Sequence, residues 1–291
     1  MLKTFSDKSI NCCITSPPYY GLRDYGVSGQ IGNEDTPEQY IEKLVNVFEE
    51  VRRILKDDGV LWLNLGDSWA GSNQGAGTKN LTKKQASNHG TNYMNTDTHK
   101  SKLSKLICYK PKDLIGIPWM AAFALREAGW YLRQDIIWAK GNPMPESVKD
   151  RCTKSHEYIF LLSKSRKYYF DYESIKEPAK YPNDNRGSRN DSRRGTKMNS
   201  ISGVTGEKRN KRDVWNVNTK PCREAHFATF PDTLIEPCVL AGCPEGGIIL
   251  DPFMGAGTTG MVAKRHNRNY VGIELNPDYV QNAENRIENK S

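Results

Sequence analysis

A succession of strand, glycine-rich turn, helix and strand near the carboxyl end limits the fold most strongly. Residues 247–250 form an apolar run, 251–259 hold the glycine-rich turn, 258–265 follow the helical period, and 270–273 are apolar again. An Asn-Pro pair at 276–277 then marks the start of a last helix. Strands that alternate with helices in this way pair in parallel, and the helices pack on the sheet. We therefore predict an α/β fold of nucleotide-binding type.

The rest of the chain supplies further elements of the same kind. Thr36, Pro37 and Gln39 form a helix start, with a capping threonine, a proline at the first helical position and a glutamine that completes a capping box. The apolar period after this start runs to Leu55 and ends at 57–59, where Asp-Asp-Gly stops a helix. The other expected elements are strands at 9–15, 60–65, 130–139 and 158–162, a helix at 113–128, and a strand at 167–171 that completes a hairpin with 158–162.

Length and composition predict a cytoplasmic protein. A chain of 291 residues is long enough for one large domain with insertions or for two domains. No stretch is long and apolar enough to span a membrane, and residues 1–7 lack the basic-then-apolar pattern of a signal peptide. The seven cysteines are odd in number and show no Cys-x-x-Cys spacing, which predicts reduced thiols and no metal site.

Positive charge is concentrated in two polar segments. The net charge is +8, and residues 176–223 hold thirteen basic and five acidic residues, so this segment alone carries an excess equal to that of the whole chain. A second segment, 72–105, has six lysines and one acidic residue. Such segments either contact a polyanion by displacing counterions from phosphates or are solvated loops, and charge alone does not decide between the two.

The glycine-rich turn predicts a site for an adenosine ligand. It reads Asp-Pro-Phe-Met-Gly-Ala-Gly-Thr-Thr at 251–259, and the next strand leads into Glu274. Glycines at such a turn also serve helix packing, but a carboxylate at the tip of the next strand can accept hydrogen bonds from two ribose hydroxyls. No third glycine follows at dinucleotide spacing and no lysine follows as a P-loop requires. An adenosine ligand without phosphates indicates S-adenosyl-L-methionine.

A Ser-Pro-Pro-Tyr sequence at 16–19 follows the first expected strand. Its simplest interpretation is a proline-rich turn. Two prolines, however, also fix the backbone so that carbonyl oxygens can face a ligand, and the tyrosine offers an aromatic face. An exocyclic amine is a poor nucleophile because its lone pair is shared with the ring, and neutral oxygen acceptors favour its reactive form. A base must leave the duplex to reach such a turn, and stacking on an aromatic ring holds it.

Together the two motifs resemble those of the amino-group DNA methyltransferases of the permuted, beta-type order. In that family the Ser/Asp-Pro-Pro-Tyr motif comes first, the target-recognition region follows, and the Asp-Pro-Phe-x-Gly-x-Gly motif comes last. This chain has the same order, and its segments 138–145 and 157–160 are similar to family elements near the base pocket. The resemblance covers nearly the whole chain. It implies a Rossmann-like, mostly parallel twisted sheet with helices on both faces and an inserted target-recognition region.

The resemblance also implies roles for individual residues. Asp67 lies where family members close the base pocket, although it fits a loop cap equally well, and Ala256 departs from the small hydroxyl residue that relatives often carry. The catalytic residues implied are Ser16, Pro17, Pro18 and Tyr19. The residues implied for binding S-adenosyl-L-methionine are Asp251, Phe253, Gly255, Gly257, Thr258, Thr259, Glu274 and Phe230.

The basic segment is the candidate for target recognition. We expect a catalytic and cofactor-binding domain at 1–175 and 221–291, a recognition insert at 176–220 and a polar loop at 70–106. The recognition sequence itself does not follow from composition. The candidate DNA-binding residues are Arg186, Arg189, Arg193, Arg194, Lys208, Arg209, Lys211 and Arg212.

Several alternatives remain open from the sequence. Serine at the first motif position resembles the cytosine-N4 enzymes more than the adenine-N6 enzymes, but both amines suit the same chemistry. An RNA or protein-amide methyltransferase would normally place its cofactor motif first, and a silent DNA-binding protein need not keep both motifs. Duplex DNA is the expected partner, and a restriction endonuclease acting separately fits the same chain. The chain is expected to be a monomer or a homodimer without a membrane partner.

Overall fold

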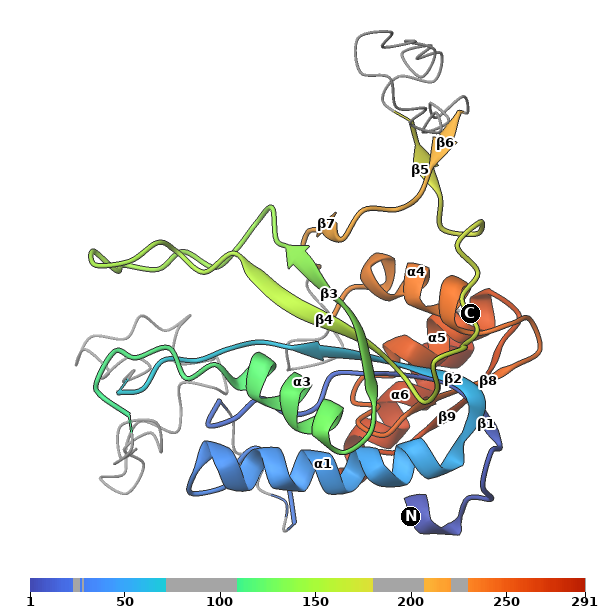
Figure 1. The fold of residues 1–291 in the computed structure, drawn as a ribbon, viewed down its shortest axis with the longest axis horizontal. Coiled ribbons are helices and arrows are strands. Elements are labelled where there is room, and N and C mark those ends of the chain that lie inside the picture. Colours follow the sequence, from blue (N-terminus) through green and yellow to red (C-terminus); the bar gives the residue numbers. More distant parts are fainter. Residues whose placement is uncertain (23–26, 28, 72–108, 180–206, 221–229, 291) are drawn as a thin grey trace, which may run out of the picture.

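The computed structural model describes residues 1–22, 27, 29–71, 109–179, 207–220 and 230–290 (Figure 1). The helices are η1 (Leu2–Thr4), α1 (Pro37–Ile54), α3 (Ile117–Glu127), α4 (Asp232–Gly242), α5 (Thr258–Arg265) and α6 (Pro277–Lys290). The strands are β1 (Ile10–Thr15), β2 (Leu55–Leu65), β3 (Tyr131–Ala139), β4 (His156–Ser163), β5 (Glu177–Pro178), β6 (Lys208–Arg209), β7 (Val214–Asn216), β8 (Ile248–Asp251) and β9 (Asn269–Gly272). Their alternation confirms the predicted α/β class.

Seven of the described strands form one central sheet, in the order β7-β3-β4-β2-β1-β8-β9. Strand β4 is antiparallel to both of its neighbours, β2 and β3, and every other neighbouring pair is parallel. The remaining six strands therefore point the same way, and their carboxyl ends lie at one edge together with the amino end of β4. Ligands of open α/β sheets bind outside the carboxyl ends of the strands, so this edge is the expected place for a site.

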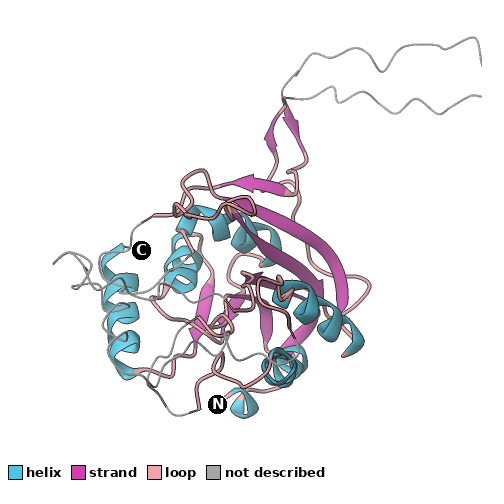
Figure 2. Ribbon diagram, turned by 90° about the vertical axis from the view of Figure 1, so that its left-hand side faces the viewer, coloured by secondary structure: helices cyan, strands magenta, loops and turns pink. Residues whose placement is uncertain are grey.

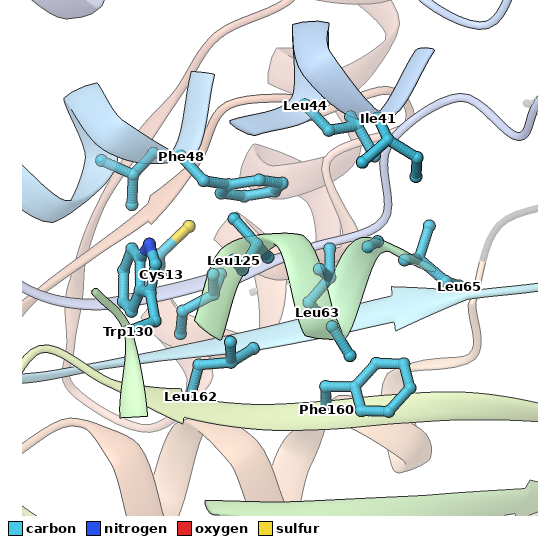
Figure 3. Close-up of a cluster of buried hydrophobic side chains, with 14 of the residues drawn as sticks. Cys13, Ile41, Leu44, Phe48, Leu63, Leu65, Leu125, Trp130, Phe160 and Leu162 are labelled. Atoms are coloured by element: carbon cyan, nitrogen blue, oxygen red, sulfur yellow. The ribbon is translucent and has the colours of Figure 1, made fainter. Parts of the chain in front are cut away.

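Helices cover both faces of the sheet, as predicted. On one face, α1 and α3 bury Leu44, Phe48 and Leu125 against Leu63 and Phe160 of the sheet (Figure 3). On the other face, α4, α5 and part of α6 bury a second apolar cluster against the same strands (Figure 1). Since both faces are covered, the central strands are apolar on both sides, as their sequences suggest.

The junction between α1 and β2 is shorter than predicted. The capping box at Thr36 is present, which confirms the predicted helix start. The strand begins at Leu55, directly after the helix and before the predicted start at 60. Leu55 pairs with Ile10 of β1, and the register then shifts so that Val60 pairs with Cys12. Leu55 matches the helical period, but burial against the neighbouring strand is what determines its conformation.

The strand predicted at 167–171 is wrong. Strand β4 already has β2 on one side and β3 on the other, so it has no free edge for a further partner. The backbone of this segment bonds elsewhere: the Tyr169 amide donates to Asp58 O, and the Asp171 amide donates to Ala241 O. The segment therefore crosses the end of the sheet as a loop.

The helix predicted at 113–128 begins later, at Ile117. Gly116 precedes it with a φ of +84°, a left-handed conformation that interrupts helical backbone. Asp113 belongs to the loop before the helix, where its carbonyl accepts a hydrogen bond from the Ala70 amide at 2.8 Å. The C-terminal strand, turn and helix units match the prediction, and Asn276 caps α6 through a 3.0 Å bond to the Asp278 amide.

Strands β5 and β6 form a two-stranded ribbon that projects from the body of the protein (Figure 2). The ribbon belongs to the segment 176–220, which the sequence predicts as the recognition insert. Strand β7 of the same segment returns to the central sheet and pairs with β3, with Trp215 opposite Trp138. This segment therefore supplies the edge strand of the central sheet, which anchors the segment to β3.

The described residues hold no helix that is long and apolar enough to cross a membrane. In the same part of the chain, no group of three or more histidine, cysteine, aspartate or glutamate side chains is arranged to hold a metal ion. The described cysteines are all free thiols.

Candidate active site at the carboxyl edge of the sheet

The two turns and Glu274, which the sequence singled out, meet at the carboxyl edge of the sheet. The Ser-Pro-Pro-Tyr turn follows β1, and the glycine-rich turn follows β8, the strand that pairs with β1. Glu274 follows β9, which pairs with the far side of β8. Neighbouring strands lie about 4.8 Å apart, so three segments distant in sequence become adjacent.

Asp251 joins two of these strands to helix α5. Its carboxylate accepts hydrogen bonds from the hydroxyls of Thr15 and Thr259, each at 2.6 Å, and from the Phe253 amide at 3.1 Å. The residue is only 1% exposed, and burial raises its pKa to about 6, although these three hydrogen bonds oppose the rise. Asp251 therefore fixes the shape of the turn, and its oxygens are already occupied within the protein.

Glu274 closes the glycine-rich turn from the next strand. Its Oε2 accepts from the Gly255 amide, and its Oε1 accepts from the amides of Leu275 and Asn276, each at 2.9 Å. A carboxylate has about four acceptor positions, two on each oxygen. The Oε1 positions are filled, whereas Oε2 accepts one hydrogen bond and has one acceptor position left.

The two glycines of the turn have different reasons to be glycine. Both have positive φ, +50° at Gly255 and +75° at Gly257. A Cβ on Gly257 would lie 2.9 Å from the Cβ of Ala283 in α6, so this glycine serves helix packing. A Cβ on Gly255 would meet nothing nearer than Phe253 O at 3.9 Å, which leaves its backbone open to a ligand.

Of the other residues expected to bind the cofactor, Phe253 belongs to this turn, and Thr258 and Thr259 end the turn and begin α5. Thr258 and Thr259 are buried at the start of α5, and the Thr258 hydroxyl accepts a hydrogen bond from Arg286 at 2.8 Å. Phe253 packs against the α1 and α3 side of the core, and Phe230 packs against the opposite cluster. The two aromatic rings thus lie against opposite cores.

The Ser-Pro-Pro-Tyr turn is held from behind by α1 and by the loop before it. Tyr40 of α1 donates its hydroxyl to Pro18 O at 2.8 Å. A Cβ on Gly32 would lie 3.2 Å from Tyr19 O, so the loop backbone packs closely on the turn. Pro17 is buried, whereas Ser16 is partly exposed. The backbone of the turn is therefore fixed, as the two prolines predict.

Tyr19 extends from this turn to the amino end of β4. Its hydroxyl donates to Glu157 Oε2 at 2.6 Å and lies 3.1 Å from Asn64 Oδ1. Burial, followed by the adjacent Glu157 carboxylate, holds the pKa of Tyr19 well above its usual value. A Cβ on Gly66 would lie 2.6 Å from the ring, so only glycine at the end of β2 admits the ring in this position.

Asp67 caps helix α3. Its Oδ1 accepts hydrogen bonds from the amides of Gly116, at 3.0 Å, and Ile117, at 3.1 Å, and also from the Ser68 amide at 2.9 Å. Of the two interpretations open from the sequence, the loop cap is the one that this geometry supports. Lys154 donates to the backbone carbonyl of Asp67, and burial lowers the pKa of this lysine.

The structure describes half of the candidate DNA-binding residues. Arg209 and Arg212 both pair with Glu177, at 3.0 and 2.7 Å, so they brace the β5–β6 ribbon. The Lys211 ammonium lies 5.0 Å from the centroid of the Trp215 ring. Lys208 is exposed on β6. The other candidates, Arg186, Arg189, Arg193 and Arg194, lie outside the described residues.

Two residues that shape the site had no assigned role in the sequence. Tyr40 fits the apolar period of α1, so the sequence gives no sign that its hydroxyl reaches Pro18. Arg286 of α6 donates to the Ala256 carbonyl and thereby supports the glycine-rich turn, a contact between distant segments. Both contacts arise from packing that no local pattern encodes.

The fold and these two turns define a class of protein, the amino-group DNA methyltransferases. The sequence pattern of the DNA methylase family of N6/N4 methyltransferases matches residues 10–285, and the chain belongs to this family. The family expected from the sequence is therefore confirmed. It comprises enzymes that methylate exocyclic amines in DNA.

Its relatives include named enzymes. The chain is 50% identical over 277 residues to the Type II methyltransferase M.SmaI of Serratia marcescens, covering 95% of this chain and 84% of that protein. It is 47% identical over 291 residues to the Type II methyltransferase M.Cfr9I of Citrobacter freundii, covering 99% of this chain and 84% of that protein.

Solved structures share the fold. The PvuII DNA methyltransferase, described as cytosine-N4-specific, aligns with a TM-score of 0.64 at 17% identity, covering 100% of this chain and 89% of that one. A putative DNA modification methylase of Thermus thermophilus, solved with S-adenosyl-L-methionine, aligns with a TM-score of 0.60 at 21% identity, covering 99% of this chain and 89% of that one.

Proposed function

We propose that this DNA methyltransferase transfers a methyl group from S-adenosyl-L-methionine to the N4 amine of cytosine in duplex DNA. One observation carries the proposal: the Ser16 turn and the Gly255 turn follow paired parallel strands, β1 and β8. An amine held at the first turn would then lie beside a methyl donor held at the second. Direct transfer requires this proximity, because in-line attack succeeds only when the reacting atoms are about 3–3.5 Å apart.

The residues at the second turn fit the donor. The open backbone at Gly255 permits close approach, and Glu274 Oε2 keeps one acceptor position. Glu274 would hold a ribose hydroxyl there, and Gly255 and Phe253 would line the same ligand. The amides that fill Glu274 Oε1 keep its carboxylate oriented toward the turn. S-adenosyl-L-methionine supplies an activated methyl group when bound.

The first turn would hold the target amine. The Ser16 hydroxyl and the Pro17 carbonyl would accept its two hydrogens and favour the form in which the nitrogen lone pair is free. Pro18 keeps the turn in shape, since its carbonyl is held by Tyr40. Tyr19 would stack on the base after the base has left the duplex. The amine nitrogen would form a bond to the methyl carbon as the carbon–sulfur bond of the donor breaks, which leaves S-adenosyl-L-homocysteine, and the methylated amine would then lose one proton to water.

We infer that the reaction uses neither a charged protein base nor a covalent enzyme intermediate. The Asp251 carboxylate is occupied by Thr15, Thr259 and a backbone amide, so it is not free to accept a proton from substrate. Two cysteines in the C-terminal third follow a proline, and the second of them is Cys238. Cys238 is buried in α4, and burial raises the pKa of its thiol. A thiol in this state is a poor nucleophile.

The basic segment would contact DNA from the β5–β6 ribbon. Within the described part of this segment, Lys208 is exposed, whereas Arg209 and Arg212 carry the Glu177 ion pairs. We propose residues 176–220 as the recognition insert, with 1–175 and 221–291 as the catalytic domain and 70–106 as a polar loop. Positive charge there would bind phosphates, while side chains at the base edges would read the sequence.

Cytosine is favoured over adenine by Ser16, because adenine-N6 enzymes of the resembled family usually carry Asp or Asn at that position. A restriction endonuclease acting separately on the same sequence is the proposed functional partner, as the Type II names of the relatives suggest. The protein would act as a monomer or a homodimer.

The test is methyl transfer to DNA followed by identification of the product. Purified protein is incubated with unmethylated duplex DNA and labelled S-adenosyl-L-methionine, and the digested nucleosides are identified by mass spectrometry. N4-methylcytosine is the expected product. N6-methyladenine as the product would show that the target base is adenine and not cytosine. Label in RNA or protein but not in DNA would contradict the proposal that DNA is the substrate.

Two variants and a control test the residue assignments. Ser16→Ala should slow transfer while leaving donor affinity intact, and Glu274→Ala should weaken donor binding measured by equilibrium dialysis. Glu245→Ala is the matched control, because Glu245 is an exposed carboxylate that forms a long ion pair of 3.7 Å with Arg268. If both test variants behaved like this control, the assignment would be wrong.

A further inference from the structure

We propose that Glu157 is a positioning residue that orients Tyr19 for the incoming base. This inference rests on the proposed function, because it assigns a role to a contact of the residue proposed to stack on the base. The structure places Glu157 at the amino end of β4, on the only strand of the described central sheet that runs against its neighbours. This reversal brings the start of β4 to the edge where β1 and β2 end.

The geometry ties the phenol to the carboxylate. Tyr19 has one hydroxyl proton, and the nearer acceptor is Glu157 Oε2 at 2.6 Å. Asn64 is itself fixed, because its side-chain nitrogen donates to the Tyr158 carbonyl at 3.0 Å and to Glu157 Oε2 at 3.3 Å. Hydrogen bonds to a charged acceptor are shorter and stronger than neutral ones, so Glu157 is the principal partner of the Tyr19 hydroxyl.

A buried ion pair holds Glu157 in place. Its other oxygen, Oε1, pairs with Lys140, and the two side chains are only 12% and 19% exposed. The Lys140 ammonium also lies 4.4 Å from the centroid of the Trp138 ring. Lys140 directly follows β3, and Trp138 is the register partner of Glu157 in the β3–β4 ladder. The sheet thus fixes the carboxylate before any substrate binds.

The aromatic ring is therefore held at two points. Its hydroxyl end is bonded to Glu157, and its Cε2 atom lies only 2.6 Å from the place that a Cβ on Gly66 would take. A ring fixed in this way presents a constant face to the base, so binding does not have to order it. Preorganisation of this kind favours the reaction because less freedom is lost on forming the reactive complex.

A double-mutant cycle tests whether Glu157 acts through the Tyr19 hydroxyl. Glu157→Ala should lower kcat by about tenfold or more with donor affinity unchanged, and Glu157→Gln, which keeps an acceptor, should recover most of the loss. In a Tyr19→Phe background, Glu157→Ala should cost no more than about twofold, because the hydroxyl is already absent. Glu146→Ala is the matched control, since Glu146 also forms an ion pair, with Arg151, but lies in the connection that precedes β4.

A second readout does not depend on activity. In protein labelled with 3-fluorotyrosine, the ¹⁹F resonance of Tyr19 is assigned by its absence in Tyr19→Phe. It should move in Glu157→Ala, return toward its wild-type position in Glu157→Gln, and stay unchanged in Glu146→Ala. The inference would be overturned, even for an active enzyme, if the Tyr19 resonance did not move in Glu157→Ala. It would also be overturned if the losses of kcat in the two single variants added up to the loss in the double variant. If the wild type methylated no DNA, the proposed function would fail while the ¹⁹F experiment still tested the contact.

Discussion

Burial of the Asp251 carboxyl group should make the stability of this protein depend on pH. Burial raises the pKa of Asp251 from 3.8 to about 6 in the folded protein, against the hydrogen bonds from Thr15 and Thr259. At a pH between these two pKa values, the carboxyl group is protonated in the folded protein and ionised in the unfolded chain. The stabilisation by this group is therefore complete below pH 3.8 and is lost as the pH rises through about 6. At ~1.4 kcal/mol per pKa unit, the free energy of unfolding should fall by about 3 kcal/mol.

Asp251→Asn is the matching perturbation, because the amide has nearly the same size and does not ionise. Urea unfolding of both proteins, at intervals from about pH 4 to about pH 7, gives the difference in their free energies of unfolding. Groups that titrate in both proteins cancel in this difference. The wild type should lose about 2.4 kcal/mol of the full ~3 kcal/mol relative to the variant over this range, because part of the change falls below about pH 4. Parallel curves for the two proteins would refute the reasoning.

Substitutions at four further positions test how the site is supported. Tyr40→Phe removes the hydrogen bond to Pro18 O, so the free energy of unfolding in urea should fall by ~1 kcal/mol and methyl transfer should slow. An unchanged rate of methyl transfer would show that this hydrogen bond does not support the catalytic turn. Asp67→Ala removes the cap of α3 and should cost ~1–2 kcal/mol in the same unfolding assay, whereas Asp67→Asn should retain most of the stability; equal losses would contradict a capping role. Gly255→Ala should lower the free energy of unfolding by ~1 kcal/mol, because alanine is strained in the left-handed backbone conformation. Gly257→Ala should lower it by more, because its Cβ would also collide with α6. Calorimetry should show weaker donor binding by the folded Gly255→Ala protein, and normal binding there would contradict the open backbone as a ligand site.

Much of the fold could be predicted because its signals are local. The capping box at Thr36 and the Asn-Pro start at 276–277 are patterns of a few residues, and both are present in the structure. The misplaced elements have a common cause. Leu55 fits a helix and a strand equally well, and the hairpin expected at 167–171 fails because β4 already has two partners. Neighbours in the sheet decide such cases, and they are distant in the sequence.

The candidate site divides in the same way. By itself, the sequence determined the family, the α/β class and the two motifs, because glycine, proline and aromatic spacing restrict the backbone locally. Only the tertiary structure decided that Asp251 is enclosed by hydroxyls, that Asp67 caps a helix and that Glu157 reaches Tyr19. The physical reason is that hydrogen-bond partners and burial depend on which strand ends meet at the sheet edge. The order of strands, with β4 reversed between β2 and β3, is a property of the whole packed chain.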